Sequence, residues 1–83
     1  MTDEELQQVR QTAEDVCRIV RVPLKVTIRD VYEREGGASV VLQAAKLEDM
    51  SDAQWHLNIK EVRDRIEEIP NVKFVELSFT QLH

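Results

Sequence analysis

The chain has 83 residues, of which 42% are hydrophobic and 33% charged, and 16 Asp and Glu against 11 Lys and Arg give a formal net charge of −5. This length predicts a single domain over residues 1–83, and the apolar fraction is typical of a globular protein rather than a disordered one. No apolar run approaches the roughly 20 residues of a membrane-spanning helix, so we expect no direct membrane insertion.

The charge balance disfavours nucleic acid as a partner, because affinity for a phosphate backbone comes mostly from Lys and Arg. The alternative is that nucleic acid binds to a local strip of basic residues. This strip would consist of Arg18, Arg21, Lys25 and Arg29. A cytoplasmic location is expected for two reasons. The single cysteine, Cys17, cannot form an internal disulfide, and the acidic residues 2–5 lack the basic start of a secretory signal.

Residues 4–21 predict the first helix. Apolar side chains recur there every three or four positions, which places them on one face of a helix. These residues are Leu6, Val9, Ala13, Val16, Cys17 and Val20. Thr2 and Glu5 have the spacing of a capping box, and Pro23 ends the helix because it disfavours helical backbone at the residue before it.

The next segment predicts a β-hairpin. Residues 24–35 begin with alternating apolar and polar side chains, the pattern of a half-buried strand, which continues across a bulge. Gly36 and Gly37 would supply the positive φ of a tight turn. Residues 38–47 then form the antiparallel partner strand, and the apolar run at 40–42 predicts a central position in the sheet.

A second helix and a third strand follow. Ser51 is a favourable N-cap, and Pro70 with Asn71 ends the helix. The apolar stripe between them consists of Trp55, Ile59, Val62, Ile66 and Ile69. Residues 72–80 alternate apolar and polar side chains and predict the last strand.

This order of elements predicts an α+β, ferredoxin-like two-layer sandwich, in which two helices cover one face of a three-stranded mixed sheet. The two strands joined by the second helix are expected to be parallel, through a right-handed crossover. A domain this small buries little apolar surface in excess of the cost of chain entropy, and its sheet has two open edges. Both features favour a homodimer.

The start of the second helix is the candidate metal site. Asp52 and His56 lie four residues apart on one helix face and could chelate a divalent cation such as zinc. A tight zinc site needs three or four ligands, and Asp49, Glu48 or a residue of a second copy could complete it. Alternatively, Asp52 only stabilises the helix N-terminus and His56 is solvated.

Catalytic signatures are missing, so we expect no enzyme. The sequence contains no glycine-rich phosphate loop, Cys-x-x-Cys, His-Glu-x-x-His or Gly-x-Ser-x-Gly. A nucleophile would have to be Ser51 or Cys17 with His56 as its base, and no sequence pattern joins them.

Several short segments carry a resemblance that spans nearly the whole chain. They are residues 26–31 (VTIRDV), the glycine pair 36–37, residues 48–56 (EDMSDAQWH), residues 62–67 (VRDRIE) and residues 70–72 (PNV). In this order they resemble the cytosolic C-terminal domain of cation diffusion facilitator transporters. The resemblance implies a metallochaperone-like module that dimerises, binds divalent metals and belongs in a membrane-transporter context.

The sequence departs from that family at the metal-binding positions. The family often carries histidines near the positions of Thr27, of Gln43 or Ala44, and of Leu77, and none is present here. Only His56 matches.

We therefore expect a non-enzymatic dimerisation or regulatory module that binds a divalent metal weakly through His56, Asp52 and Asp49. The alternative is a stand-alone protein-interaction or small-ligand-sensing domain with no metal role. Iron–sulfur scaffold domains share the order of elements, but their Cys-x-x-Cys is missing here.

Overall fold

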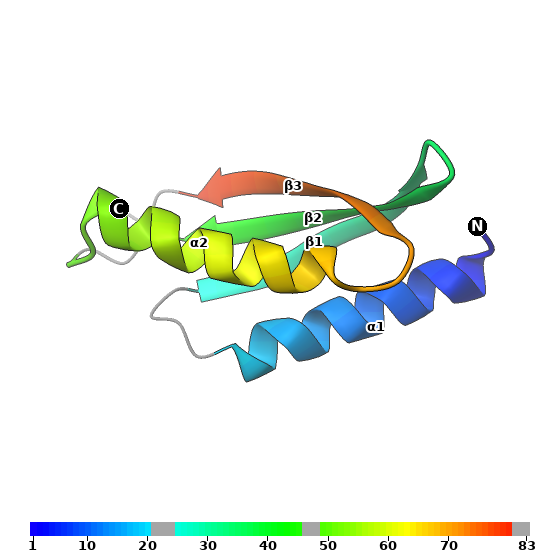
Figure 1. The fold of residues 1–83 in the computed structure, drawn as a ribbon, viewed down its shortest axis with the longest axis horizontal. Helices are drawn as coiled ribbons and strands as arrows, with labels where there is room; N and C mark the ends of the chain where they lie inside the picture. The colour runs from blue at the N-terminus through cyan, green and yellow to red at the C-terminus, as the bar shows by residue number, and fades with distance from the viewer. Residues whose placement is uncertain (21–24, 46–48, 81–83) are drawn as a thin grey trace.

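The computed structural model describes residues 1–20, 25–45 and 49–80. These residues form two helices and three strands, drawn in Figure 1. The elements are α1 (Asp3–Ile19), β1 (Lys25–Arg34), β2 (Gly37–Ala45), α2 (Asp52–Glu67) and β3 (Val72–Thr80). The order α-β-β-α-β is the predicted one, and the α+β fold class is confirmed.

Helix α1 begins with the predicted capping box. The backbone N–H of Glu5 donates to Thr2 Oγ1 at 3.1 Å, and the backbone N–H of Thr2 donates to Glu5 Oε1 at 3.0 Å. The helix ends at Ile19 rather than at residue 21, because Val20 has extended backbone with φ −70° and ψ 113°. Pro23, the predicted terminator, lies outside the described residues.

The sheet has the order β1-β2-β3, so β2 is the central strand, as predicted. β1 pairs antiparallel with β2, and β3 pairs parallel with β2. The expected bulge in β1 falls between Ile28 and Asp30. It inserts one extra residue, Arg29, and thereby keeps both Ile28 and Val31 on the apolar side of the sheet.

The hairpin turn corrects the sequence prediction. Positive φ occurs at Glu35 (49°) and Gly36 (78°), whereas Gly37 is the first residue of β2. Gly37 is required for space instead, because a Cβ there would lie 2.5 Å from both Cγ and Cδ of Lys73. The two glycines therefore meet different constraints: one permits the turn and the other lets the Lys73 side chain pass.

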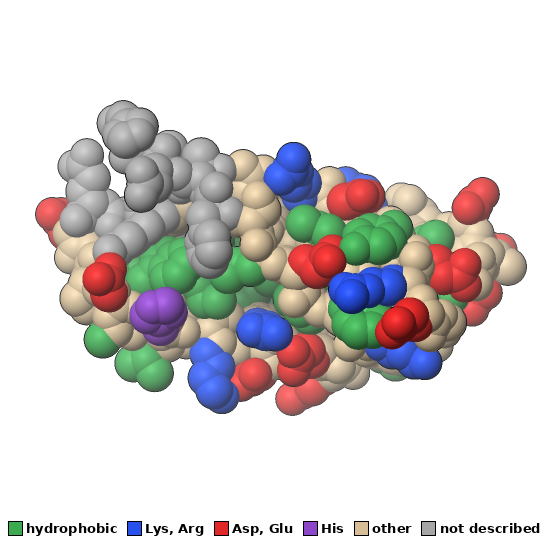
Figure 2. Space-filling model, turned by 90° about the horizontal axis from the view of Figure 1, so that it is seen from above, with side chains coloured by type: hydrophobic (Ala, Val, Ile, Leu, Met, Phe, Trp, Pro, Cys, Tyr) green, Lys and Arg blue, Asp and Glu red, His purple; other side chains and the backbone are tan. Residues whose placement is uncertain are grey.

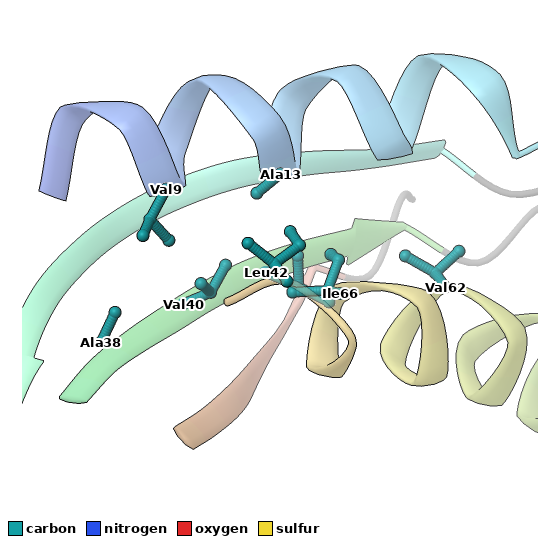
Figure 3. Packing of buried hydrophobic residues seen from close by; sticks show 8 residues of the cluster. Val9, Ala13, Ala38, Val40, Leu42, Val62 and Ile66 are labelled. Carbon is teal, nitrogen blue, oxygen red and sulfur yellow. The ribbon is translucent and has the colours of Figure 1, made fainter. Parts of the chain in front are cut away.

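Both helices cover the same face of the sheet (Figure 1). In Figure 3, Val9 and Ala13 of α1 and Val62 and Ile66 of α2 point toward the central strand. The buried residues that they meet on β2 are Ala38, Val40 and Leu42. The predicted stripe of α2 is buried from Ile59 onward, and Trp55 at its start is half-buried. Neither helix in the described ranges has the length and hydrophobicity to cross a lipid bilayer.

Candidate functional site

The first turn of α2 has the predicted N-cap. The backbone N–H of Gln54 donates to Ser51 Oγ at 3.2 Å, and the Ser51 backbone is extended with ψ 157°. The Ser51 hydroxyl oxygen therefore caps the helix by accepting a hydrogen bond. Asp52 follows in the first turn, where a carboxylate interacts favourably with the positive end of the helix dipole.

The three predicted metal ligands are all exposed: Asp49 before the helix, Asp52 in its first turn and His56 one turn later. The His56 ring lies edge-on to Trp55, with ring centroids 5.4 Å apart and an interplanar angle of 76°. Among the residues that the structure describes, no three His, Cys, Asp or Glu side chains gather closely enough to hold a metal ion. Glu48 lies outside the described residues, so the ligand set stays a prediction.

Helix α2 has a buried asparagine that the apolar pattern of the sequence does not predict. Asn58 is 7% exposed, accepts a hydrogen bond from Gln54 Nε2 at 3.3 Å and has its Nδ2 3.8 Å from Met50 Sδ. These contacts tie the segment before α2 to the helix. The feature of the sequence that could have predicted this burial is the position of Asn58 next to Ile59, which belongs to the apolar stripe of the helix.

A groove runs between α2 and β3, which we call the α2–β3 groove; its volume is about 450 Å³. Trp55, Ile59 and Leu77 supply its apolar part. Its charged rim consists of His56, Lys60, Arg63, Asp64 and Glu67. Figure 2 looks onto this side of the molecule and shows an apolar area next to a histidine side chain. Such an opening can accept an apolar side chain of a partner.

The face of the sheet away from the helices, the open face, carries a network centred on Glu76. The Glu76 carboxylate accepts hydrogen bonds from Tyr32 Oη at 2.6 Å and Ser39 Oγ at 3.2 Å, and pairs with Arg34 Nη1 at 3.3 Å. The Arg34 guanidinium carbon also lies 4.2 Å from the centre of the Phe74 ring. The Tyr32 hydrogen bond, helped by Ser39 and by the Arg34 charge, lowers the pKa of Glu76 below its ordinary value.

Two of the positions where the resemblance places histidines are neighbours on the open face. Thr27 is the register partner of Gln43, which is in turn the partner of Ser78, so the three form one row across the strands. Ser78 Oγ also accepts a hydrogen bond from Arg29 at 3.0 Å. Hydroxyl and amide groups are poor zinc ligands, so this row offers hydrogen bonds rather than a zinc site. The remaining candidate positions, at Ala44 and Leu77, belong to the helix-covered side.

The proposed basic strip is divided between the two faces of the sheet. Arg18 on α1 pairs with Asp15 on the helix side, whereas Arg29 bonds Ser78 on the open face. Arg21 lies outside the described residues.

Cys17 is half-buried on α1 and packs against the core. Burial raises the pKa of its thiol, and the Glu14 carboxylate raises it further. Because the reactive form of cysteine is the thiolate, this environment disfavours a catalytic role.

Comparison with known proteins supplies a likeness of fold. No family model and no curated protein matches the sequence. Among solved structures, a chain of CzrB, a protein assigned as a zinc transporter, is similar over 100% of this chain and 99% of that chain, with a TM-score of 0.65 and 13% sequence identity. At this identity the similarity shows a shared arrangement of helices and strands.

Proposed function

We propose that this chain is a non-enzymatic dimerisation and regulatory module of the kind that a cation transporter carries in the cytosol. The observation that carries the proposal is the likeness to the CzrB chain. The likeness covers all of this chain and 99% of the other, so nearly every part of each chain has a counterpart in the other. The sequence segments that resemble cation diffusion facilitators support the same assignment independently.

The surface of the domain supports a role in association. Both β1 and β3 are edge strands within the described part of the sheet, and the α2–β3 groove leaves apolar surface beside one of them. Leu57 on α2 is 65% exposed and Ile19 on α1 is 71% exposed. A small domain with open edges and exposed apolar groups gains stability from a second copy.

The side chains that could act as nucleophiles support a role outside catalysis. The Ser51 hydroxyl oxygen accepts the helix-capping hydrogen bond, and burial raises the pKa of the Cys17 thiol, which disfavours its reactive thiolate form. Weak binding of a divalent cation at Asp52 and His56 is a further part of the proposal. Since the described residues of one chain bring no three such ligands together, the third ligand would come from Glu48 or from a second copy.

Sedimentation velocity across the micromolar range tests the dimerisation proposal. We expect the weight-average mass to rise from that of one chain to that of two as the concentration increases. A mass that stays at the monomer value up to the highest soluble concentration would contradict it.

A further inference from the structure

A methionine and a buried asparagine meet where the chain enters α2. Asn58 is only 7% exposed, and both ends of its side-chain amide are in contact with neighbours. Its Oδ1 accepts a hydrogen bond from Gln54 Nε2 at 3.3 Å, and its Nδ2 donates to Met50 Sδ at 3.8 Å. In the part of the chain that the structure describes, this thioether sulfur is the only acceptor bonded to Asn58 Nδ2.

This contact joins a donor that needs a partner to an acceptor that is weak. A buried amide N–H destabilises a fold unless it donates a hydrogen bond. A thioether sulfur accepts only weakly, so the hydrogen-bonding capacity of Asn58 Nδ2 is poorly used. Oxidation of the thioether to a sulfoxide makes the same side chain polar, and its S–O oxygen is a strong acceptor. The buried amide would therefore bind oxidised Met50 better than the reduced form.

The two methionines of the chain differ in what a sulfoxide oxygen would meet. Met50 is half-buried and lies directly before the Ser51 N-cap, outside any helix or strand. The Met1 side chain is 6% exposed and packs against the apolar core. An oxygen added to Met1 would enter apolar surroundings, which is the usual way in which methionine oxidation disrupts a core. An oxygen added to Met50 has the Asn58 amide as a partner.

We propose that Met50 is an oxidative modification site, and that its sulfoxide strengthens the contact with Asn58 and fastens the segment before α2 to the helix. The oxidant is a hydroperoxide. A lone pair of the Met50 sulfur attacks one peroxide oxygen, so that the S–O bond forms as the O–O bond breaks. The sulfur loses two electrons, and the departing oxygen gains them. With hydrogen peroxide this oxygen takes up the remaining proton and leaves as water.

The proposal fixes the sign of the effect on stability. Methionine oxidation in a packed core lowers stability, whereas here it should raise it. The melting temperature should increase by about 2–6 °C, the shift expected when one hydrogen bond is strengthened in a domain of this length. This inference concerns Met50 and Asn58 alone and does not depend on dimerisation or on metal binding.

Treatment of three chains with hydrogen peroxide tests the proposal. All three carry Cys17→Ala, because a thiol also reacts with peroxide. One is otherwise wild type, one adds Met50→Leu and one adds Asn58→Ala. Peptide mass mapping measures the oxidation of Met50 and Met1, and thermal melting measures stability before and after treatment.

We expect only the otherwise wild-type chain to become more stable. The Met50→Leu chain keeps Met1 and therefore measures the effect of oxidising Met1 alone, so its melting temperature should not rise. The Asn58→Ala chain keeps the thioether but lacks the buried donor. Its Met50 should still be oxidised, without the gain in melting temperature.

NMR gives a readout that is independent of stability, and it decides the question if Asn58→Ala fails to fold. The side-chain amide protons of Asn58 should move downfield when Met50 is oxidised, because their acceptor becomes stronger. The side-chain amide protons of Gln7, which is exposed on α1, should not move.

Several results would overturn the proposal. They are a melting temperature that falls or stays constant when Met50 is oxidised, a rise that Asn58→Ala retains, and Asn58 protons that do not move. Resistance of Met50 to peroxide under conditions that oxidise free methionine would also exclude it as a modification site. None of these results bears on the dimerisation proposed above, which sedimentation tests separately.

Discussion

Two adjacent glycines serve different purposes in the turn between β1 and β2. Gly36 has a φ of +78°, and the nearest atom to a Cβ added there is Lys73 Nζ at 4.0 Å. Gly37 has ordinary φ, but a Cβ would lie 2.5 Å from Lys73 Cγ and Cδ and 3.0 Å from Lys73 Cβ. One position is restricted by backbone conformation and the other by the stem of a neighbouring side chain.

We therefore expect Gly37→Ala to lower the free energy of unfolding by about 1–3 kcal/mol, the usual cost of overpacking. Most of this cost should disappear in a Lys73→Ala background, because the colliding Cγ and Cδ atoms are then gone. Urea unfolding of the four variants of this double-mutant cycle measures the coupling.

Gly36→Ala is the matched control. Its cost, about 1–2 kcal/mol for a left-handed alanine, should be the same with and without Lys73. If Gly37→Ala costs as much in the Lys73→Ala background as in the wild type, the contact with Lys73 is not the reason for the glycine.

Among the elements, the start of α2 combines a structural role with a candidate chemical one. Ser51 caps the helix through the backbone N–H of Gln54, and Asp52 lies at the positive end of the helix dipole. His56 lies one turn later and is exposed. Asp52 and His56 therefore lie four residues apart in the helix, which is the spacing that the predicted cation site requires.

For this site we expect isothermal titration with zinc to give a binding heat with the wild-type chain that an Asp52→Ala, His56→Ala double variant lacks. The physical reason is that the double variant removes the only two predicted ligands on one helix face. Asp64→Ala, which removes an exposed carboxylate paired with Lys60 further along α2, should leave the heat unchanged. Equal heats for the wild-type chain and the double variant would exclude zinc binding through these residues.

The elements themselves were predictable because their signals are local. The apolar stripe of α2, the Thr2–Glu5 capping box and the alternation in β1 depend on residues a few positions apart, and each is found in the structure. The parallel pairing of β2 with β3 followed from the intervening helix.

The Glu76 network was not predictable from the sequence, because its members come together only through the register of three strands. Tyr32 pairs with Ser39 in one ladder, and Glu76 pairs with Val41 in the other. A shift of one residue in either strand would turn these side chains to the opposite face. The position of Lys73 over Gly37 has the same origin, since it depends on the register shift near the start of β3.

At the scale of the whole molecule, the Glu76 network joins the two edge strands across the central one. Donors reach Glu76 from β1 through Tyr32 and Arg34, and from β2 through Ser39. The network lies on the open face, where no helix covers the sheet in the described part of the chain. It therefore holds β1 and β3 in register from the side opposite the apolar core.

This arrangement makes the stability of the fold depend on pH in a definite direction. Because the Tyr32 and Ser39 hydrogen bonds and the Arg34 charge lower the pKa of Glu76 in the folded state, its ionised form stabilises the native chain. That contribution is fully present above the pKa that glutamate has in the unfolded chain. It is lost as the pH falls through the lowered pKa of the folded state.

We accordingly expect Glu76→Gln to melt at a lower temperature than the wild-type chain at neutral pH, and the difference to shrink steadily once the pH passes below the ordinary glutamate range. Glu61→Gln, which removes an exposed carboxylate paired with Arg65 on α2, should follow the wild-type pH profile closely. Thermal melts at a series of pH values compare the three chains. A difference between Glu76→Gln and the wild type that stays constant down to strongly acidic pH would mean that ionised Glu76 does not stabilise the sheet through these donors.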